Sequence, residues 1–248
     1  RSRPFERLLL QLTPFFADAI TVVSEQIRVS FNPWLRRKMC VVHNPVSFTA
    51  KTRTAERSSG NGQAKLLLSV GRMTEQKNQA CLIEAFGRIA AKFPDWTLRI
   101  AGDGPLAADL AAQVLASGLS GRVELPGNIA DIGAEYENAD LFVLPSRYES
   151  FGLATAEAIM HGLPVVGFAG CPGTNELIRP GENGLLAEGN GNVDALAATL
   201  SKLMGDPDAL KRRQNAPTQW LQDAYALGHV LDVWEQLVMP YANTGTHR

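Results

Sequence analysis

Two glutamates, Glu149 and Glu157, lie eight residues apart, where a strand-like run gives way to a helix-like run. The strand-like run is 139–144, and the helix-like run is 153–161. The carboxyl end of a strand in an α/β sheet is where such sheets bind ligands. At about 100° per residue, helical geometry would bring the two side chains within about 80° of each other. Carboxylates accept hydrogen bonds from hydroxyls, so the pair predicts a ligand with hydroxyls at both ends and a diphosphate between them.

Two cations follow an earlier strand-like run that ends at Gly71. A glycine lets the backbone turn sharply beside a ligand. Arg72 offers a planar guanidinium suited to phosphate, and Lys77 adds a point charge five residues later. The pair indicates a diphosphate site, and the alternative is a solvated loop whose charges bind nothing.

Two further glycine turns follow strand-like runs, one at Gly102 and one at Gly127. The first resembles part of a dinucleotide-binding fingerprint, but the full GxGxxG pattern is absent. The turn at Gly127 indicates that the backbone lies close to another group, which is either the planar base of a nucleotide or simply the rest of the turn. Tight turns without a ligand remain the alternative for both.

Gly152 and Leu153 open the helix that carries Glu157. The free amides and the dipole of a helix N-terminus make an anion site, so these two residues are predicted to hold phosphate. A second glycine-rich loop, 171–178, contains Glu176. There Thr174 is expected simply to cap a helix that starts at the next residue.

Histidines and cysteines predict no catalytic or metal chemistry. His161 ends a helix before a glycine, and His43 lies on a short strand, so both receive structural interpretations. The three cysteines are far apart without CxxC spacing, which is typical of a reducing compartment and of neither a disulfide framework nor a zinc site. No metal ligand set and no cofactor are expected.

Composition places the chain among ordinary globular proteins. It has 248 residues, of which 45% are hydrophobic and 20% charged, with a net charge of −1. No broad electrostatic footprint for nucleic acid is present, and no apolar run reaches the roughly 18 residues that span a bilayer. We expect a cytoplasmic location, with the basic run 36–38 either at the inner membrane face or simply solvated. The chain begins with Arg1 on an amphipathic pattern, so we expect a piece of a longer protein.

The elements that position these residues alternate regularly from residue 65. Strands are predicted at 66–71, 96–102, 123–125, 141–144, 164–168 and 184–187, and helices at 79–91, 106–115, 131–138, 153–161 and 193–204. Apolar strands separated by helices predict an α/β fold: a parallel, Rossmann-like sheet with helices on both faces. Upstream, a helix is predicted at 6–17 and strands at 19–24 and 39–43, and a helical tail follows 205 with an apolar face that includes Trp220 and Trp234.

The ordered set of motifs resembles the family-four retaining glycosyltransferases of GT-B fold over residues 65–205. The matching pieces are Gly71-Arg72 with Lys77, Gly102–Pro105, Val123–Gly127, Ala139–Gly152, Glu157-Ala158, Gly162–Val165, Glu176–Ile178 and Asn183-Gly184. Each motif is weak alone, and their order makes the resemblance specific. Residues 17–25 and 41–46 also look like the end of that family's first domain.

The resemblance implies the following roles. Arg72 and Lys77 would neutralise the donor diphosphate, and Glu149 would contact hydroxyls of the donor sugar. Glu157 would bind the ribose hydroxyls, while amides at Gly152 and Leu153 hold phosphate. The remaining implied contacts lie beside the diphosphate and around the base, and they are made by Gly71, Gly102, Asn128 and Ile129. We expect the base to be uracil.

The resemblance also implies a domain organisation. Residues 1–46 would be a remnant of the acceptor-side domain, 47–64 a linker, 65–205 the nucleotide-sugar-binding domain and 206–241 a helical tail. The implied reaction is metal-independent transfer from a UDP-sugar, with retention, to a cell-surface glycan or lipid-linked acceptor. Most of the first domain is missing, so we expect donor binding with poor transfer or none. Without that domain, the apolar face of the tail is exposed or pairs with another chain.

Three other functions stay open at this point. A GT-B sugar-nucleotide epimerase would need additional acid and base groups and no acceptor. A nucleotide-binding module without catalysis fits a truncated chain. An NAD-dependent oxidoreductase is disfavoured by the missing GxGxxG and by the Arg72 and Lys77 pair. The sugar, acceptor and linkage are not encoded in any residue that we recognise.

Overall fold

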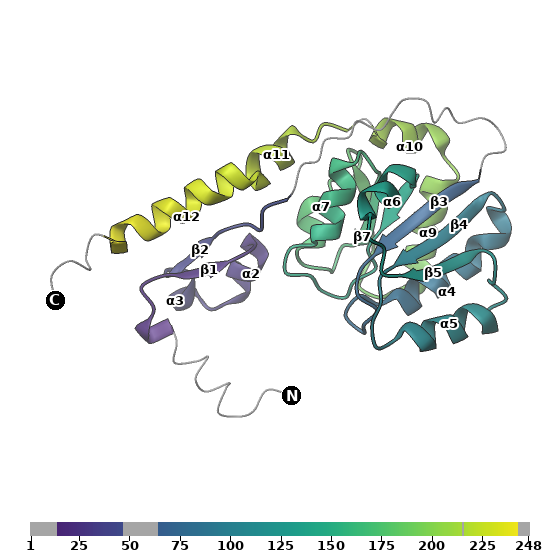
Figure 1. Ribbon diagram of the computed structural model, residues 1–248, viewed down its shortest axis with the longest axis horizontal. Helices are drawn as coiled ribbons and strands as arrows, with labels where there is room; N and C mark the ends of the chain where they lie inside the picture. The colour runs from purple at the N-terminus through teal and green to yellow at the C-terminus, as the bar shows by residue number, and fades with distance from the viewer. Residues whose placement is uncertain (1–13, 47–63, 215, 243–248) are drawn as a thin grey trace.

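A six-stranded parallel sheet forms the centre of the computed structural model, which describes residues 14–46, 64–214 and 216–242 (Figure 1). The strand order is β5-β4-β3-β6-β7-β8, with every neighbouring pair parallel. The strands are β3 (Lys65–Val70), β4 (Trp96–Ala101), β5 (Val123–Gly127), β6 (Leu141–Val143), β7 (Val165–Phe168) and β8 (Gly184–Ala187). The predicted Rossmann-like sheet is thereby confirmed.

Helices cover both faces of the sheet, which explains why β3, β6 and β7 are buried without alternation. The strands β4 and β5 instead alternate, with Arg99 and Glu124 on their less buried side. On β3, Leu67 packs into one core, while Leu66 and Leu68 pack into the other. The first core is shared by α4 (Gln79–Ile89), the one-turn η1 (Ala90–Lys92), α5 (Ala107–Ala116) and α9 (Val193–Met204). The second core is shared by α6 (Ile132–Asn138), α7 (Leu153–Met160) and α8 (Thr174–Leu177).

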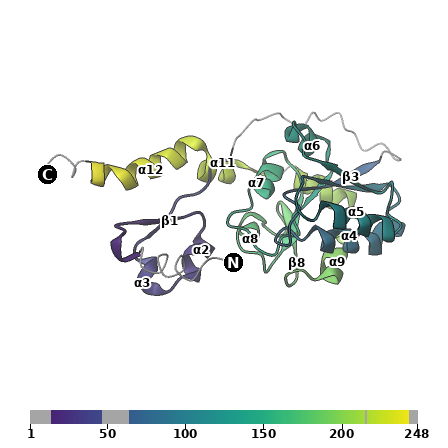
Figure 2. The same ribbon diagram turned by 60° about the horizontal axis from the view of Figure 1, so that its bottom comes forward.

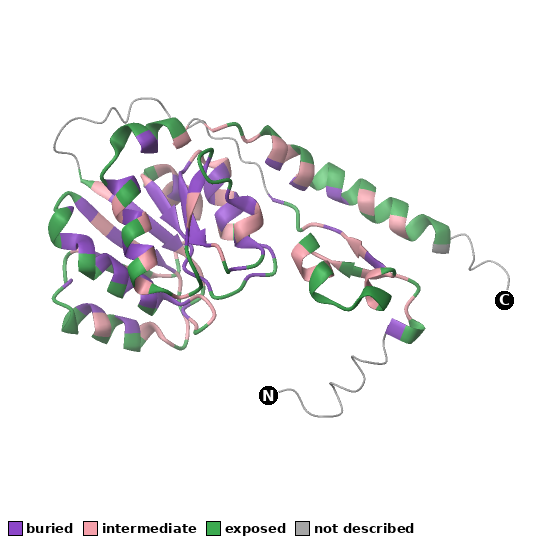
Figure 3. Ribbon diagram, turned by 180° about the vertical axis from the view of Figure 1, so that it is seen from behind, coloured by how far each residue is buried: buried purple, intermediate pink, exposed green. Residues whose placement is uncertain are grey.

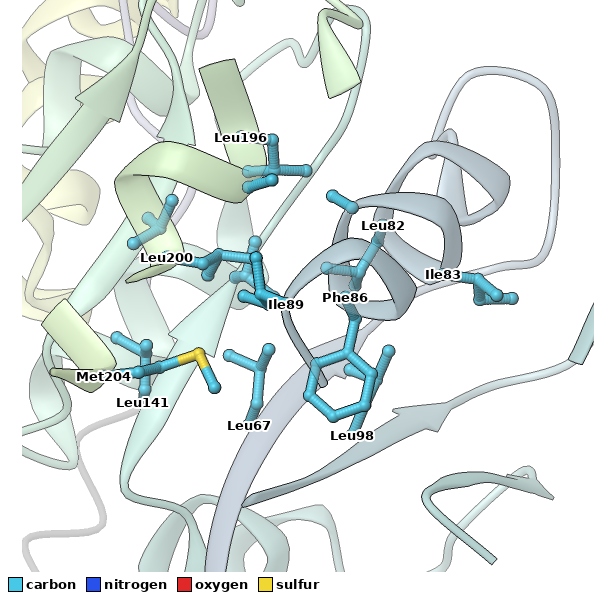
Figure 4. Packing of buried hydrophobic residues seen from close by; sticks show 14 of the residues in the cluster. Leu67, Leu82, Ile83, Phe86, Ile89, Leu98, Leu141, Leu196, Leu200 and Met204 are labelled. Atoms are coloured by element: carbon cyan, nitrogen blue, oxygen red, sulfur yellow. The ribbon is translucent and has the colours of Figure 1, made fainter. Parts of the chain in front are cut away.

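In the first core, α4 and α9 pack directly against each other. Figure 4 shows Phe86 and Ile89 of α4 beside Leu200 of α9, above Leu67 and Leu98 of the sheet. All five of these side chains are buried, and Figure 3 shows that burial is concentrated on the strands and the inner helix faces. Burying an aliphatic or aromatic side chain of this size contributes about 1.5–3 kcal/mol. This core holds the strand ends in a fixed arrangement.

The N-terminal segment forms a separate small unit. The two predicted strands are present as β1 (Ile20–Val22) and β2 (Met39–Val41), and the structure pairs them in parallel. Between them lie α2 (Glu25–Ser30) and α3 (Pro33–Arg36), which the sequence did not reveal because they are short and have no buried residue. The predicted helix at 6–17 lies mostly outside the described residues. So does the 47–64 linker, apart from its last position.

The predicted helical end consists of α10 (Pro207–Gln214), α11 (Gln219–Tyr225) and α12 (Leu227–Ala242). Its first part packs on the sheet domain, because α10 contributes Ala209 and Leu210 to the first core and α11 contributes Leu221 to the second. Beyond it, α12 extends away from the sheet (Figures 1 and 2). Within the described ranges, no helix combines the length and the apolar character that crossing a bilayer requires.

Candidate functional site

A cleft of about 420 Å³ lies at the carboxyl ends of β3, β4 and β5. Five of the ten predicted site residues line it together with four others. The lining residues are Val70, Gly71, Arg72, Ala101, Gly102, Asp103, Asn128, Ile129 and Ile132. Of the other predicted residues, Lys77, Glu149, Gly152, Leu153 and Glu157, none is among these nine.

Backbone hydrogen bonds join the three strand ends that form the floor of the cleft. Gly71 donates to the Ala101 carbonyl at 3.0 Å, and Gly102 donates to the Gly127 carbonyl at 2.8 Å. A Cβ at position 102 would lie 2.2 Å from the carbonyl oxygen of Gly71, and φ at this residue is +134°. The contact between strand ends therefore requires glycine at 102 whether or not a ligand approaches.

Arg72 lies on the wall of the cleft with its side chain exposed. Its guanidinium makes no hydrogen bond or ion pair with the residues that the structure describes. The backbone beneath it is held by Gln79, whose Nε2 donates to the Arg72 carbonyl at 3.0 Å. A fixed loop with an uncommitted guanidinium is suited to bind an anion. Gln79 carries no sequence signal that would have marked it as part of the site.

Lys77 and Glu149 form an ion pair across two loops. The Lys77 Nζ lies 2.6 Å from Glu149 Oε1, and the two side chains are 20% and 9% exposed. The Ser146 Oγ donates to the same oxygen, also at 2.6 Å. Within the described chain, Oε2 of this carboxylate takes no hydrogen bond. One oxygen is thus held by two donors, and the other remains available to a ligand hydroxyl.

The loops that follow β3, β6 and β7 pack against one another and position this pair. Arg147 donates its backbone N–H to the Gln76 carbonyl at 2.8 Å, and Gln76 Nε2 donates to the Tyr148 carbonyl at 2.9 Å. Glu149 donates its N–H to the Pro172 carbonyl at 3.2 Å. The two contacts made by Gln76 join residues about 70 positions apart in the chain, so the meeting of Lys77 with Glu149 depends on tertiary packing.

Glu157 is half-buried on α7, and its Oε2 accepts a hydrogen bond of 2.9 Å from the hydroxyl of Tyr136 on α6. Burial raises the pKa of the Glu157 carboxyl, and the Tyr136 hydrogen bond partly opposes that rise. Burial and the nearby Glu157 charge raise the pKa of Tyr136, which keeps its hydroxyl protonated. Sequence reasoning missed Tyr136, since a tyrosine on a short helix is typical of core packing.

The segment between the two glutamates differs from expectation in two ways. Residues 145–152 form a loop, so the helical extrapolation of the angle between Glu149 and Glu157 was wrong. Thr174 does not cap α8: Gly173 precedes that helix, and Thr174 is its first residue. A Cβ on Gly173 would lie 2.7 Å from the Glu149 carbonyl oxygen, so glycine is required where the two loops touch.

The start of α7 lies beside the Glu149 loop. Gly152 is buried with φ +86°, while Leu153, the first helical residue, is 43% exposed. The first amides of a helix have no partner within it, so the start of α7 stays a predicted anion site. No group of three or more His, Cys, Asp or Glu side chains within the described ranges is arranged to hold a metal ion.

The glycosyl transferases group 1 family matches residues 51–220. This chain belongs to that family. An uncharacterized glycosyltransferase of Haemophilus influenzae is 27% identical over 197 residues, which are 79% of this chain and 54% of that protein. A Mycobacterium tuberculosis glycogen synthase is 31% identical over 201 residues, which are 80% of this chain and 47% of that protein. The chain thus spans about half the length of these relatives.

Solved structures show the same fold. The sucrose-phosphate synthase of Thermosynechococcus elongatus has a TM-score of 0.80 at 22% identity, with 98% of this chain and 63% of that chain covered. Anabaena HepE in complex with UDP and glucose has a TM-score of 0.78 at 22% identity, with 95% and 66% covered. At these identities the likeness shows the fold, which is the Rossmann-like half of a GT-B glycosyltransferase.

Proposed function

We propose that this chain is the donor-binding half of a family-four retaining glycosyltransferase that uses a nucleoside diphosphate sugar, which we expect to be a UDP-sugar. The observation that carries this proposal is the cleft at the strand ends, with the uncommitted Arg72 on its wall. The group 1 family supports a glycosyltransferase, and a structural neighbour was crystallised with UDP and glucose.

The diphosphate is the part of the donor that needs positive charge. Arg72 reaches it from the wall of the cleft, and Lys77, further along the same β3–α4 loop, reaches it while sharing its charge with the Glu149 carboxylate. The amides of Gly152 and Leu153 add hydrogen-bond donors at the positive end of a helix dipole. As the glycosidic bond breaks, negative charge grows on the leaving diphosphate, and donors fixed in advance stabilise it.

The remaining groups recognise the two ends of the donor. Glu149 Oε2 accepts hydrogen bonds from hydroxyls of the sugar, because Oε1 is already held by Lys77 and Ser146. Glu157 accepts from the ribose hydroxyls, and Asn128 with Ile129 lines the wall against which the base lies. In this arrangement the protein's own cations and amides neutralise the diphosphate, which is why we propose metal-independent transfer.

The acceptor side lies outside this chain in our proposal. We propose a glycan or lipid-linked acceptor, with the enzyme working at the inner face of a membrane. The apolar face of α12, where Leu231 is 50% and Trp234 41% exposed, supports self-association of the isolated chain.

The first prediction concerns the nucleotide that the chain binds and the separate binding roles of Glu149 and Glu157. Calorimetric titration of this chain, without added metal, is expected to show binding of UDP in preference to GDP, ADP and NAD. Glu157→Ala is expected to weaken UDP binding by about tenfold to 100-fold, since a hydrogen bond to a charged group contributes about 1.5–3 kcal/mol. Glu149→Ala is expected to spare UDP but to weaken binding of UDP-glucose or UDP-N-acetylglucosamine and to abolish transfer.

A matched control is Glu182→Gln, because this carboxylate is 63% exposed and lies at the opposite edge of the sheet, just before β8. Binding of NAD alone, or unchanged nucleotide affinity in both glutamate variants, would contradict the proposed site. Conversion of the UDP-sugar into an isomer in the absence of an acceptor would instead indicate an epimerase.

A further inference from the structure

Tyr136 is a buried aromatic residue whose hydroxyl lies next to the carboxylate of Glu157, the candidate ribose-binding residue. The side chain is 1% exposed. Its ring stacks on His161 at a centroid distance of 5.2 Å and contacts Phe142 at 5.8 Å, so packing fixes its direction. The hydroxyl oxygen lies 2.9 Å from Glu157 Oε2. The hydroxyl of a ring held this way has little freedom to move away from the carboxylate.

The Tyr136 hydroxyl has one proton and two acceptors within reach. The ionised Glu157 carboxylate at 2.9 Å is a closer and stronger acceptor than the Ala154 carbonyl at 3.4 Å. A protonated Glu157 is a poorer acceptor and can donate its own proton to the tyrosine oxygen, which frees the hydroxyl to turn to Ala154. The pair therefore has one arrangement for each charge state of Glu157.

We propose that Tyr136 is a positioning residue for nucleotide binding: its hydroxyl holds one oxygen of Glu157, so that the other oxygen is presented, ionised, to the hydroxyls of a nucleoside diphosphate. The inference rests on the proposed function and adds a residue to it. Ile132, on the same helix α6, lines the cleft, which places the helix that carries the hydroxyl against the ligand site.

The arrangement has a consequence for pH. Burial raises the pKa of Glu157, and the Tyr136 hydrogen bond lowers it. Among the elements packed against α7, strands β6 and β7 carry no titratable side chain, and α8 carries Glu176, whose Oε1 accepts the N–H of Gln26 at 3.2 Å. His161, at the end of α7 itself, stacks on Tyr136. Ribose recognition by an ionised Glu157 is present above its pKa and is lost as pH falls through it.

The test is Tyr136→Phe in this chain, with two readouts. Without ligand, ¹³C NMR titration of the Glu157 carboxyl is expected to show a higher pKa than in the wild type, because the hydrogen bond to the charged form is gone. Calorimetry with UDP is expected to show about tenfold weaker binding at neutral pH. The acidic loss of UDP binding should also begin at a higher pH in the variant.

Thr199→Val is the control, since it removes a half-buried hydroxyl that donates to the Ala195 carbonyl within α9, in the other core, and neither readout should change. Tyr136→Phe could instead lower only the melting temperature and leave the Glu157 pKa and the UDP affinity unchanged. That result would show that Tyr136 serves packing alone, and it would overturn this inference without affecting the proposed function. A wild-type chain that binds no nucleoside diphosphate would overturn the proposed function and, with it, the ligand assigned to Glu157.

Discussion

At the residue scale, both candidate carboxylates are held by the protein at one oxygen. Glu149 has one oxygen held by Lys77 and Ser146, and Glu157 has one oxygen held by Tyr136. A carboxylate that is hydrogen-bonded at one oxygen has already lost rotational freedom before the ligand binds. Binding therefore costs less side-chain entropy. The protein partners of each glutamate therefore matter as much as the glutamate itself.

Ser146→Ala tests this at Glu149. We expect unchanged UDP affinity but about tenfold weaker binding of a UDP-sugar, because one of the two donors that hold Oε1 is lost and such hydrogen bonds contribute about 1.5–3 kcal/mol. Calorimetry with UDP and with UDP-glucose measures both. Ser69→Ala, which removes a buried serine hydroxyl from β3, should leave both affinities unchanged. Equal losses for UDP and UDP-sugar in Ser146→Ala would refute a sugar-specific role.

At the element scale, the cleft exists because three neighbouring parallel strands end together. β3, β4 and β5 lie side by side, and their last residues exchange backbone hydrogen bonds at Gly71, Gly102 and Gly127. The floor of the cleft is therefore backbone, which lets a ligand come close, and its walls are the side chains that follow each strand.

Gly102→Ala is expected to break this floor. The new Cβ would lie 2.2 Å from the Gly71 carbonyl oxygen at φ +134°, so the strand ends must separate. We expect a destabilisation of more than about 3 kcal/mol in urea unfolding, together with loss of UDP binding. Gly118→Ala is the control, because φ there is +65° but a Cβ would meet nothing within 4 Å. Gly118→Ala should lower the free energy of unfolding by about 1 kcal/mol and leave UDP binding unchanged. Similar losses of stability in both variants would refute the argument that the Cβ contact at residue 102 is responsible.

At the scale of the whole molecule, one aromatic cluster joins three distant segments. Tyr225 of α11 contacts the ring of His43 at 4.6 Å and that of Phe151, in the Glu149 loop, at 4.9 Å. The N–H of Val46 also donates to the Tyr225 carbonyl at 2.9 Å. The N-terminal unit, the helical end and the site loop thus share one anchoring point.

Tyr225→Ala is expected to lower the free energy of unfolding by about 3–5 kcal/mol, as large-to-small changes at buried aromatics do, and to weaken UDP binding by loosening the loop before Gly152. Urea unfolding and calorimetry measure the two effects. Trp234→Ser on α12 is the contrasting change, because this side chain is 41% exposed. It should leave stability nearly unchanged and reduce self-association in analytical ultracentrifugation. A stable Tyr225→Ala variant would show that the cluster does not anchor the helical end.

The sequence by itself determined the order and type of the elements from residue 65, because apolar runs, helical periodicity and glycine turns are local properties of the chain. It also predicted Arg72, Lys77, Glu149 and Glu157 as candidates for the chemistry, and that prediction awaits the binding experiments. It could not show that Lys77 meets Glu149, or that Tyr136 holds Glu157, because each pair joins separate elements. Those partnerships, like the exposed face of α12, were decided only by the tertiary structure, where the packing of the sheet and its helices sets the distances between side chains.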